Sequence, residues 1–136
     1  MADVFTSKHR SVIMSRIKGA NTKPEIVVRS IVHSLGYRFR LHNKQLPGKP
    51  DLVLPRHKKI IFVNGCFWHG HVGCPRAALP TSNVEFWNSK ISGNKIRDLS
   101  VKRKLKRMGW KVLVVWQCRT RDLEKLRYEL QQFLAQ

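Results

Sequence analysis

The chain has 136 residues, and 42% of them are hydrophobic, which is enough for one domain that buries a core without disulfides. Lys and Arg number 27 against 8 Asp and Glu, and the formal charge of +19 implies a polyanionic partner, with nucleic acid as the first candidate and an acidic membrane surface as the second. No apolar run approaches the length of about 18 residues that a bilayer span needs, and the first residues lack the layout of a signal peptide. We therefore expect a soluble cytoplasmic protein with no membrane partner, whose cysteines stay reduced.

Residues 1–20 are polar and basic, with a few aliphatic residues between the charges. This composition suits a short helix or arm that lies on an acidic surface. An amphipathic helix that only packs against the domain is the alternative. We expect the core to span residues 21–136, so that the chain is one domain with a basic N-terminal arm.

A helix is predicted to begin at residues 22–25. Thr22 can cap it, Pro24 suits its first turn, and Glu25 lies three residues after the cap, as in a capping box. Apolar residues then recur at helical spacing, and Gly36 is placed to end the helix. Considered alone, Glu25 is explained by this capping role.

Three short strands are predicted after this helix. Residues 37–42 alternate strictly between apolar and polar, which predicts a half-buried strand with Arg38, Arg40 and His42 on an open basic face. Residues 51–54 and 59–63 follow as two apolar runs joined by a tight turn, which predicts an antiparallel hairpin.

The second half of the chain predicts three further elements. Residues 84–108 indicate a long helix with a densely basic outer face and a bend at Gly93. Residues 110–116 indicate the last strand, and residues 123–134 a closing amphipathic helix. The order helix, three strands, helix, strand, helix is typical of a compact α/β domain.

The cysteines suggest a metal site. Cys66, His71 and Cys74 lie in one loop after an apolar run that is predicted to be a buried strand. Cys118 follows the last apolar run and is expected to reach the same loop. Ligands of these types and in this number suit a closed, structural zinc site. The alternative is three buried free cysteines with an exposed histidine, and zinc is favoured because the set uses every cysteine.

Asp51 opens a predicted strand next to the strand that ends at Val63. A carboxylate at this point is typical of metal-dependent nucleases. Mg²⁺ prefers oxygen ligands and keeps several waters, so one carboxylate, a backbone carbonyl and phosphate oxygens can hold it. Such an ion can stabilise charge on an attacked phosphate and activate water. Pro-Asp pairs are also common in turns, and turn chemistry is the alternative explanation.

Large aromatic residues surround the histidine of the cysteine loop. Phe67 and Trp68 come directly before His69, and Trp87 lies on the next predicted helix. For any single aromatic residue, the core is the favoured location. Phe67 and Trp68 are adjacent in a loop, however, and cannot easily both point inward. In a basic protein, an exposed aromatic cluster indicates insertion between bases, where stacking offsets part of the cost of unstacking the duplex.

Taken together, these motifs resemble the Vsr-type very-short-patch repair endonucleases, and the resemblance covers nearly the whole chain. The matching residues are Arg10-Ser11, Met14-Ser15-Arg16-Ile17, Asn21-Thr22-Lys23-Pro24-Glu25, Leu46-Pro47-Gly48-Lys49-Pro50-Asp51, Gly65-Cys66-Phe67-Trp68-His69-Gly70-His71, Glu85-Phe86-Trp87, Asn94, Arg97-Asp98 and Gly109-Trp110.

The resemblance implies a restriction-endonuclease-like fold, in which a central mixed sheet is flanked by helices and one Zn²⁺ is structural. The zinc ligands match Cys66, His71, Cys74 and Cys118. It also implies a catalytic Mg²⁺ held by Asp51 and the backbone carbonyl of Val63. His69 would accept a proton from water, and Glu25 and Asp98 would support the centre.

For the substrate, the resemblance implies duplex DNA with a T:G mismatch, nicked 5′ of the thymine to begin repair of deaminated 5-methylcytosine. Phe67, Trp68 and Trp87 would insert beside the mismatch. The residues expected to bind DNA are Arg10, Arg16, Lys49, Asn94, Lys95 and Arg97. A monomer suits asymmetric nicking, and other repair proteins are possible partners.

The chain departs from the family pattern at Asn64, where familiar members carry a histidine. Asparagine can donate a hydrogen bond to a phosphate or a metal-bound water, but it cannot accept and carry a proton near neutral pH. Our hypothesis is that proton transfer falls to His69 and that Asn64 only orients.

Two other functions are compatible with these residues. One is a zinc-stabilised protein that binds distorted DNA without cleaving it, with Asn64 as the sign of lost activity. The other is a related nicking endonuclease with a different sequence specificity.

Overall fold

The computed structural model describes residues 22–136. The N-terminal arm, with the DNA contacts predicted for Arg10 and Arg16, lies outside the described residues.

A four-stranded mixed sheet forms the centre of the domain. Its strands are β1 (Arg40–Leu41), β2 (Leu52–Leu54), β3 (Lys59–Asn64) and β4 (Lys111–Trp116), and they lie side by side in chain order. β2 is antiparallel to both of its neighbours, β1 and β3, whereas β4 runs parallel to β3. The predicted hairpin and the central mixed sheet are therefore confirmed.

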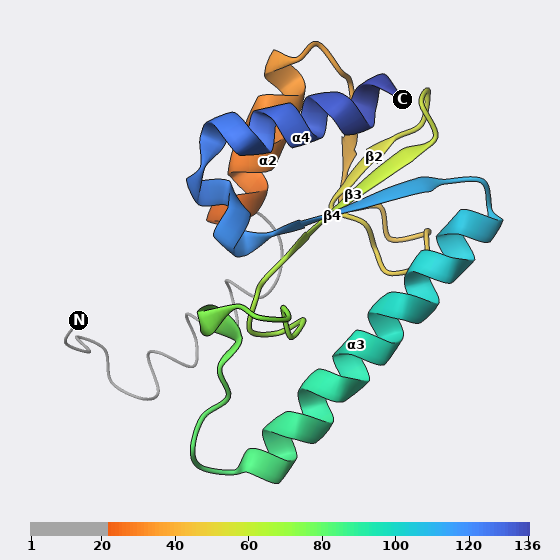
Figure 1. Cartoon of the computed structure of the whole chain (residues 1–136). Helices are drawn as coiled ribbons and strands as arrows, with labels where there is room; N and C mark the ends of the chain where they lie inside the picture. The colour runs from red at the N-terminus through yellow and green to blue at the C-terminus, as the bar shows by residue number, and fades with distance from the viewer. Residues whose placement is uncertain (1–21) are drawn as a thin grey trace.

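Three helices cover the sheet (Figure 1). Helices α2 (Lys23–Ser34) and α4 (Leu123–Ala135) lie together on one face, and α3 (Val84–Arg107) lies on the other. Two short 3₁₀ helices, η1 (Pro75–Ala77) and η2 (Gln117–Arg121), complete the described elements. Because β3 and β4 are parallel, the chain needs a long crossover between them, and α3 supplies it.

Alternation along the strands divides the core between the two faces. Leu52, Leu54 and Ile61 pack with α2 and α4, whereas Val53 and Ile60 point to the α3 side. All five side chains are buried. Full burial of one such aliphatic side chain stabilises the fold by about 1.5–3 kcal/mol. Helices therefore cover both faces of the sheet. The edge formed by the ends of the strands remains available for functional side chains.

A buried lysine attaches the end of α4 to the sheet. The Lys59 ammonium donates hydrogen bonds to the carbonyls of Leu134 and Gln136, both at 2.8 Å, and lies 5.6 Å from the centre of the Phe133 ring. Burial lowers the pKa of Lys59. The ammonium satisfies carbonyls at the helix end that have no partner within the helix.

The structure corrects the extent of the first strand. The strand predicted over residues 37–42 is only Arg40–Leu41, and His42 is half-buried with a left-handed φ of 50° instead of lying on an open face. The partner strand β2 has only three residues, between Pro50 and Pro55, and Pro has no N–H for the ladder. β1 can therefore pair over only a short length.

The helix predictions are confirmed in type and extent. The Thr22 hydroxyl accepts a hydrogen bond from the Glu25 N–H at 3.4 Å, so Thr22 caps α2 as expected. The predicted bend at Gly93 is wrong, since α3 passes through this residue as a straight, continuous helix (Figure 1). Among residues 22–136, no helix is both long enough and apolar enough to cross a membrane.

Candidate active site

The strand directions bring an end of each strand to the same edge of the sheet, which is the edge that runs across the strands. β1 and β3 end at this edge, β2 starts there because it is antiparallel to both, and β4 ends there because it is parallel to β3. The residues at these positions are His42 after β1, Asp51 before β2, Asn64 at the end of β3 and Cys118 just after β4.

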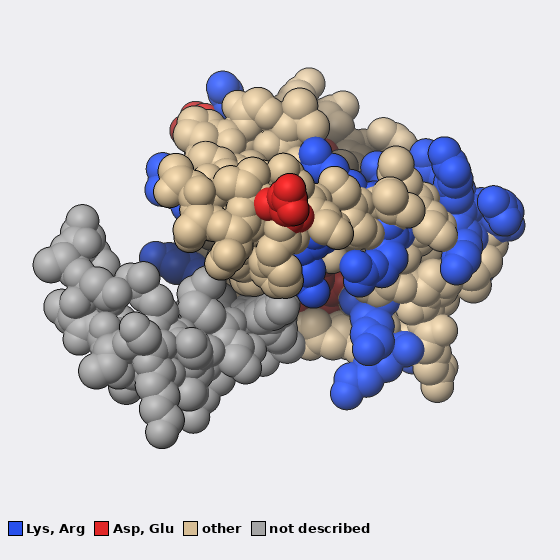
Figure 2. Space-filling view, turned by 90° about the horizontal axis from the view of Figure 1, so that it is seen from below, with Lys and Arg blue, Asp and Glu red and all other residues tan. Residues whose placement is uncertain are grey.

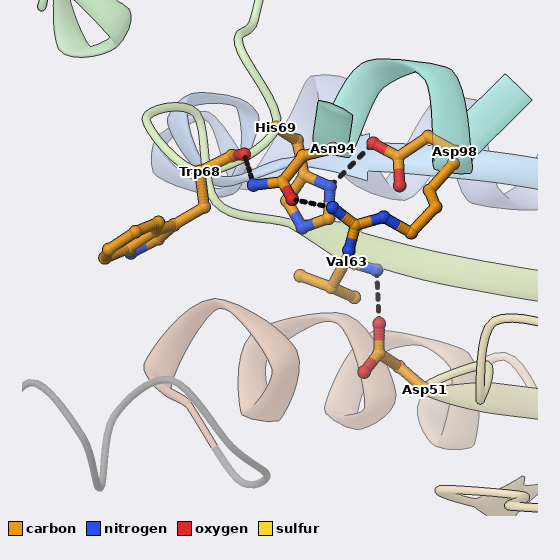
Figure 3. Close-up of polar contacts among 7 residues, drawn as sticks. Asp51, Val63, Trp68, His69, Asn94 and Asp98 are labelled. Carbon is orange, nitrogen blue, oxygen red and sulfur yellow. Dashed lines mark hydrogen bonds and ion pairs between the residues drawn. The ribbon is translucent and has the colours of Figure 1, made fainter. Parts of the chain in front are cut away.

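Asp51 is held by the neighbouring strand. Its Oδ2 accepts a hydrogen bond from the Val63 N–H at 2.7 Å (Figure 3). Burial raises the pKa of Asp51 from 3.8 to about 6, and the Val63 hydrogen bond opposes this increase. The charge of Glu25 raises the pKa further, while His42 and His69 lower it. The carboxylate is therefore close to all three groups.

Glu25 and His42 complete a group with Asp51 that we call the carboxylate centre. Glu25 lies in the first turn of α2 and is only 2% exposed, and His42 Nε2 contacts its Oε1 directly. One ligand atom from each of the three residues lies within 4.8 Å of the others. Glu25 is therefore more than a capping residue, and this set can hold a metal ion.

Sequence reasoning did not place His42 at this centre, because its position depends on the register of β1 and β2 in the folded sheet. In the β1–β2 pair, Leu41 lies opposite Leu52, so counting one residue further places His42 opposite Asp51. The backbone confirms this, because the His42 N–H donates to the Asp51 carbonyl at 3.1 Å.

His69 forms a pair with Asp98 of α3 (Figure 3). The distance between His69 Nδ1 and Asp98 Oδ2 is 2.7 Å, and both side chains are partly exposed. A carboxylate can only accept in such a contact, so Nδ1 carries the proton and Nε2 is left with a free lone pair. The arrangement makes Nε2 able to accept a proton.

A chain of hydrogen bonds attaches the loop to α3. Asn94 donates to the Trp68 carbonyl at 2.8 Å, and Arg97 donates to the Asn94 side-chain oxygen at 3.0 Å (Figure 3). Close packing adds to this attachment, because a Cβ on Gly70 would lie 2.7 Å from the Ile91 side chain. Asn94 and Arg97 thus hold the loop in place, and the DNA contacts predicted for them stay predictions.

Two other basic residues predicted to contact DNA flank this region. Lys95 is exposed on α3 and its side chain lies over Gly70, and Lys49 is exposed in the turn before Asp51. Figure 2 shows the face of the molecule on the α3 side, where Lys and Arg side chains gather and few acidic ones are visible. The basic residues of α3 are Lys90, Lys95, Arg97, Lys102, Arg103, Lys104, Lys106 and Arg107. A surface of this charge suits the phosphates of a nucleic acid.

The loop and α3 together form an aromatic cluster. Ring centroids lie 5.2 Å apart for Phe67 and Trp68, 5.3 Å for Phe67 and Trp87, and 5.9 Å for Trp68 and Trp87. The Trp68 ring projects away from the His69–Asp98 pair (Figure 3). Sequence reasoning gave no separate role to Phe86, which is 60% exposed and packs on Trp87 at 5.1 Å.

Cys66, His71, Cys74 and Cys118 form a second group, which we call the sulfur centre. Their ligand atoms all lie within 4.8 Å of one another, and His71 Nδ1 is 3.5 Å from Cys118 Sγ. A tetrahedron of ligands about 2.3 Å from a metal has edges of about 3.7 Å, so the spacing fits one ion. The His71 ring also stacks on Trp116 at 4.2 Å, which fixes its orientation.

Asn64 is the last residue of β3. In the sequence it follows the residues of the carboxylate centre and precedes those of the sulfur centre. It is 7% exposed and pairs in register with Trp116 of β4. The sheet therefore fixes the backbone at Asn64, and the orienting role of this residue stays a prediction.

Comparison with known proteins identifies relatives over the whole chain. The profile of the family described as DNA mismatch endonuclease Vsr matches residues 2–75. The chain is 46% identical to the type II nicking enzyme V.XorIIP of Xanthomonas oryzae, over 98% of each protein. It is 39% identical to the type II nicking enzyme V.NmeAIP of Neisseria meningitidis, over 100% of this chain and 96% of that protein. It is 40% identical to the DNA mismatch endonuclease Vsr of Escherichia coli, over 95% of this chain and 82% of that protein.

A solved structure supports the fold. The catalytic domain of the homing endonuclease I-Bth0305I superposes with a TM-score of 0.58, over 85% of this chain and 96% of that one, at 22% sequence identity. Together with the mixed sheet and its flanking helices, this likeness confirms the restriction-endonuclease-like fold expected from the sequence.

Proposed function

The chain belongs to the Vsr family of DNA mismatch endonucleases, and from that premise we propose that it nicks one strand of duplex DNA 5′ of the thymine in a T:G mismatch. The reaction is Mg²⁺-dependent hydrolysis of a phosphodiester bond, and it begins very-short-patch repair of deaminated 5-methylcytosine. The observation that carries this proposal is that the carboxylate centre lies close to His69. The loop that contains His69 also contributes Phe67 and Trp68 to the aromatic cluster.

The donors near Asp51 fit a hard divalent ion. Glu25 and Asp51 supply carboxylate oxygens within 4.8 Å of each other. The Val63 N–H points at Asp51, and the N–H and C=O of one strand residue point to the same side, which supports the Val63 carbonyl as a further oxygen ligand. When bound, Mg²⁺ stabilises charge on the attacked phosphate and lowers the pKa of a bound water.

The protein residues handle the proton. His69 Nε2 accepts a proton from the water that attacks phosphorus, while Asp98 holds the ring through Nδ1 and stabilises the imidazolium that forms. Asn64 is buried at the end of β3, a few residues before His69 in the sequence. It orients groups there and does not carry a proton. Glu25 supports the centre with a second negative charge.

Mismatch recognition falls to the aromatic cluster. Phe67, Trp68 and Trp87 insert into the duplex beside the mismatch, and unstacking a base step costs a few kcal/mol. That cost is smaller at a mismatched pair than at a matched one, which favours T:G sites. The contacts of Asn94 with the loop keep the aromatic rings in register with the catalytic groups.

We assign Zn²⁺ to the sulfur centre, in a structural role. Two thiolates from the loop, one from η2 and an imidazole are the ligand types of closed tetrahedral zinc sites. Cys66 is fully buried, so the site excludes water on that side. The ion would attach the loop to the end of β4.

A monomer is proposed as the active form, because one carboxylate centre is enough to nick one strand. Contacts with other repair proteins and a cytoplasmic location stay predictions.

Two alternatives make different predictions. The X. oryzae and N. meningitidis relatives are type II nicking enzymes by name, which favours a nicking enzyme defined by its sequence context as the second candidate. A protein that binds distorted DNA without cleavage is the third, with Asn64 as its mark.

Labelled duplexes separate the three candidates. The protein is incubated with Mg²⁺ and a T:G duplex or the matched C:G duplex, beside Asp51→Asn and the control Glu124→Gln, which removes an exposed carboxylate of α4. The proposal predicts a Mg²⁺-dependent nick 5′ of thymine in the T:G duplex alone, lost in Asp51→Asn and kept in Glu124→Gln. Equal nicking of both duplexes would support the second candidate, and binding without nicking the third.

A further inference from the structure

His42 reaches the carboxylate centre from an element of its own. Glu25 comes from the first turn of α2, Asp51 precedes β2, and His42 follows β1. One ligand atom from each residue lies within 4.8 Å of the other two. An ion bound to either carboxylate would therefore have the His42 imidazole within reach.

The backbone directs the His42 side chain to this position. The β1–β2 ladder continues for one more bond after its last regular pair, because the His42 N–H donates to the Asp51 carbonyl. A left-handed φ of 50° at His42 then breaks the strand alternation. The ring turns toward α2, and Nε2 faces Glu25 Oε1 directly. Nε2 and the Glu25 carboxylate therefore face the same space, where one ion could bind both.

The charges around Asp51 call for a cation. Glu25 is almost fully buried beside Asp51, and two carboxylates at such a distance repel each other. Within residues 22–136, the charged groups that most affect Asp51 are Glu25, His42 and His69, and none of them is Lys or Arg. A divalent ion would offset both negative charges at once.

We propose that His42 is a direct ligand of the catalytic divalent ion through Nε2, so that one imidazole nitrogen joins the oxygen ligands of that ion. This inference rests on the proposed function, since it assigns a further ligand to the same ion. Imidazole is a ligand that Mg²⁺ rarely uses and that Mn²⁺ and later transition metals accept more readily. The centre should therefore favour Mn²⁺ over Mg²⁺ more strongly than an oxygen-only site would.

The competing role is that of a positioning residue, in which His42 only hydrogen-bonds Glu25. Both roles predict slower nicking when His42 is replaced, so activity alone does not separate them. A ligand role predicts a nitrogen nucleus bonded to the ion and a changed preference between metals. A positioning role predicts neither.

Pulsed electron paramagnetic resonance of bound Mn²⁺ tests the nitrogen directly. The full chain is loaded with zinc, freed of other metals and given Mn²⁺ below one equivalent. We expect coupling from one ¹⁴N nucleus in the wild type, lost in His42→Gln and kept in His69→Gln and His33→Gln. His33 is an exposed residue of the last turn of α2, about 12 Å along the helix from Glu25.

Calorimetry with Mn²⁺ and with Mg²⁺ provides the second readout. We expect His42→Gln to weaken Mn²⁺ binding about tenfold more than Mg²⁺ binding, as loss of a nitrogen ligand requires. Equal weakening for both metals would assign His42 a positioning role. Absence of ¹⁴N coupling in the wild type, or its persistence in His42→Gln, would overturn the proposal.

Two precautions keep the test decisive. If His42→Gln does not fold, wild-type protein labelled with ¹⁵N-histidine replaces it, and the ¹⁴N signal must change to that of ¹⁵N. Nicking of the T:G duplex is measured on the same samples. Nicking without histidine coupling defeats the His42 proposal alone, whereas coupling without nicking defeats the proposed function alone.

Discussion

The sulfur centre and the carboxylate centre lie at the same edge of the sheet but are built in opposite ways. Three of the four sulfur-centre residues come from one loop, residues 66–74, and only Cys118 arrives from η2. The carboxylate centre takes each of its residues from a different part of the chain: Glu25 from α2, His42 from the end of β1 and Asp51 from the start of β2. One centre is local in sequence, and the other exists only in the folded domain.

The two centres also differ in the chemistry of their ligands. Thiolates and imidazole in a closed set suit an ion that holds a loop, whereas carboxylates that leave coordination positions open suit an ion that binds phosphate and water. His69 lies between Cys66 and His71 in the chain and pairs with Asp98. In the proposed function, the local centre fixes the loop that brings the proposed proton acceptor to the non-local centre.

The largest effect is expected from breaking the sulfur centre with Cys66→Ser. Burial raises the pKa of the Cys66 thiol, and a bound metal would hold this residue as the thiolate. Structural zinc contributes about 10–16 kcal/mol to folding of small domains, compared with about 5–15 kcal/mol for the total stability of a typical domain. We expect zinc content, the cooperative melt and nicking all to be lost, measured by metal analysis, calorimetry and the T:G assay. Val72→Ser, an exposed change in the same loop, is the control. A normal melt in Cys66→Ser would refute the structural role.

The next largest effect concerns the proton acceptor. His69→Ala should lower kcat for nicking about 10²–10⁴-fold, the usual range for loss of a general base, with unchanged zinc content and little change in Tm. His33→Ala removes an exposed histidine from α2 and should leave kcat, zinc content and Tm unchanged. Wild-type nicking by His69→Ala would show that another group takes the proton, and would contradict the assignment of His69 as the proton acceptor.

A smaller effect is expected from the residue that positions His69. Asp98→Asn should lower kcat about 10–100-fold with little change in KM, because a neutral amide stabilises the imidazolium less and permits the wrong tautomer. Asp98→Glu should restore part of the rate, and the pH profile of kcat should change in Asp98→Asn. Glu85→Gln on the exposed first turn of α3 is the matched control. An unchanged pH profile would indicate that Asp98 is not coupled to His69 during the reaction.

The smallest expected effect is a change in stability at the carboxylate centre. It is a gain, whereas breaking the sulfur centre is expected to cause a loss. Asp51 has a pKa of about 6 in the fold against an ordinary value of 3.8, so the folded state holds this proton more tightly than the unfolded state does. The group favours folding below pH of about 4, and this contribution is lost as the pH rises through about 6. The shift corresponds to about 3 kcal/mol, of which a partly solvated carboxyl realises about half.

Asp51→Asn should therefore stabilise the Mg²⁺-free protein by about 1–2 kcal/mol at pH 7.5 and by nothing at pH 4, while it abolishes nicking. Chemical denaturation at the two pH values measures the difference, with zinc present throughout. A variant that is less stable at pH 7.5 would mean that the Val63 hydrogen bond outweighs the burial of the charge.

Much of the local structure could be predicted from short sequence patterns. The Thr22 cap, the hairpin of β2 and β3, and the long basic helix α3 each depend on residues that are neighbours in the chain. The sulfur centre was predictable for the same reason, since its loop contains three of the four residues and the chain has only one further cysteine.

Other features depended on tertiary context. The alternation of residues 37–42 predicts a full strand, but the available partner is three residues long, so pairing ends early and His42 leaves the strand geometry. Propensity describes what a segment can form, whereas the neighbouring strand decides how much of it forms.

The sequence by itself determined the types of the elements, the residues of the sulfur centre and the excess of positive charge, because periodicity, capping and composition act between close neighbours or do not depend on position. The family resemblance implied that Glu25 and Asp98 lie near Asp51, but only the tertiary structure decided that His42 joins Glu25 and Asp51, and that Asp98 faces His69. Those contacts depend on strand register and on the packing of α2 and α3 against opposite faces of the sheet, which bring together residues that the chain keeps far apart.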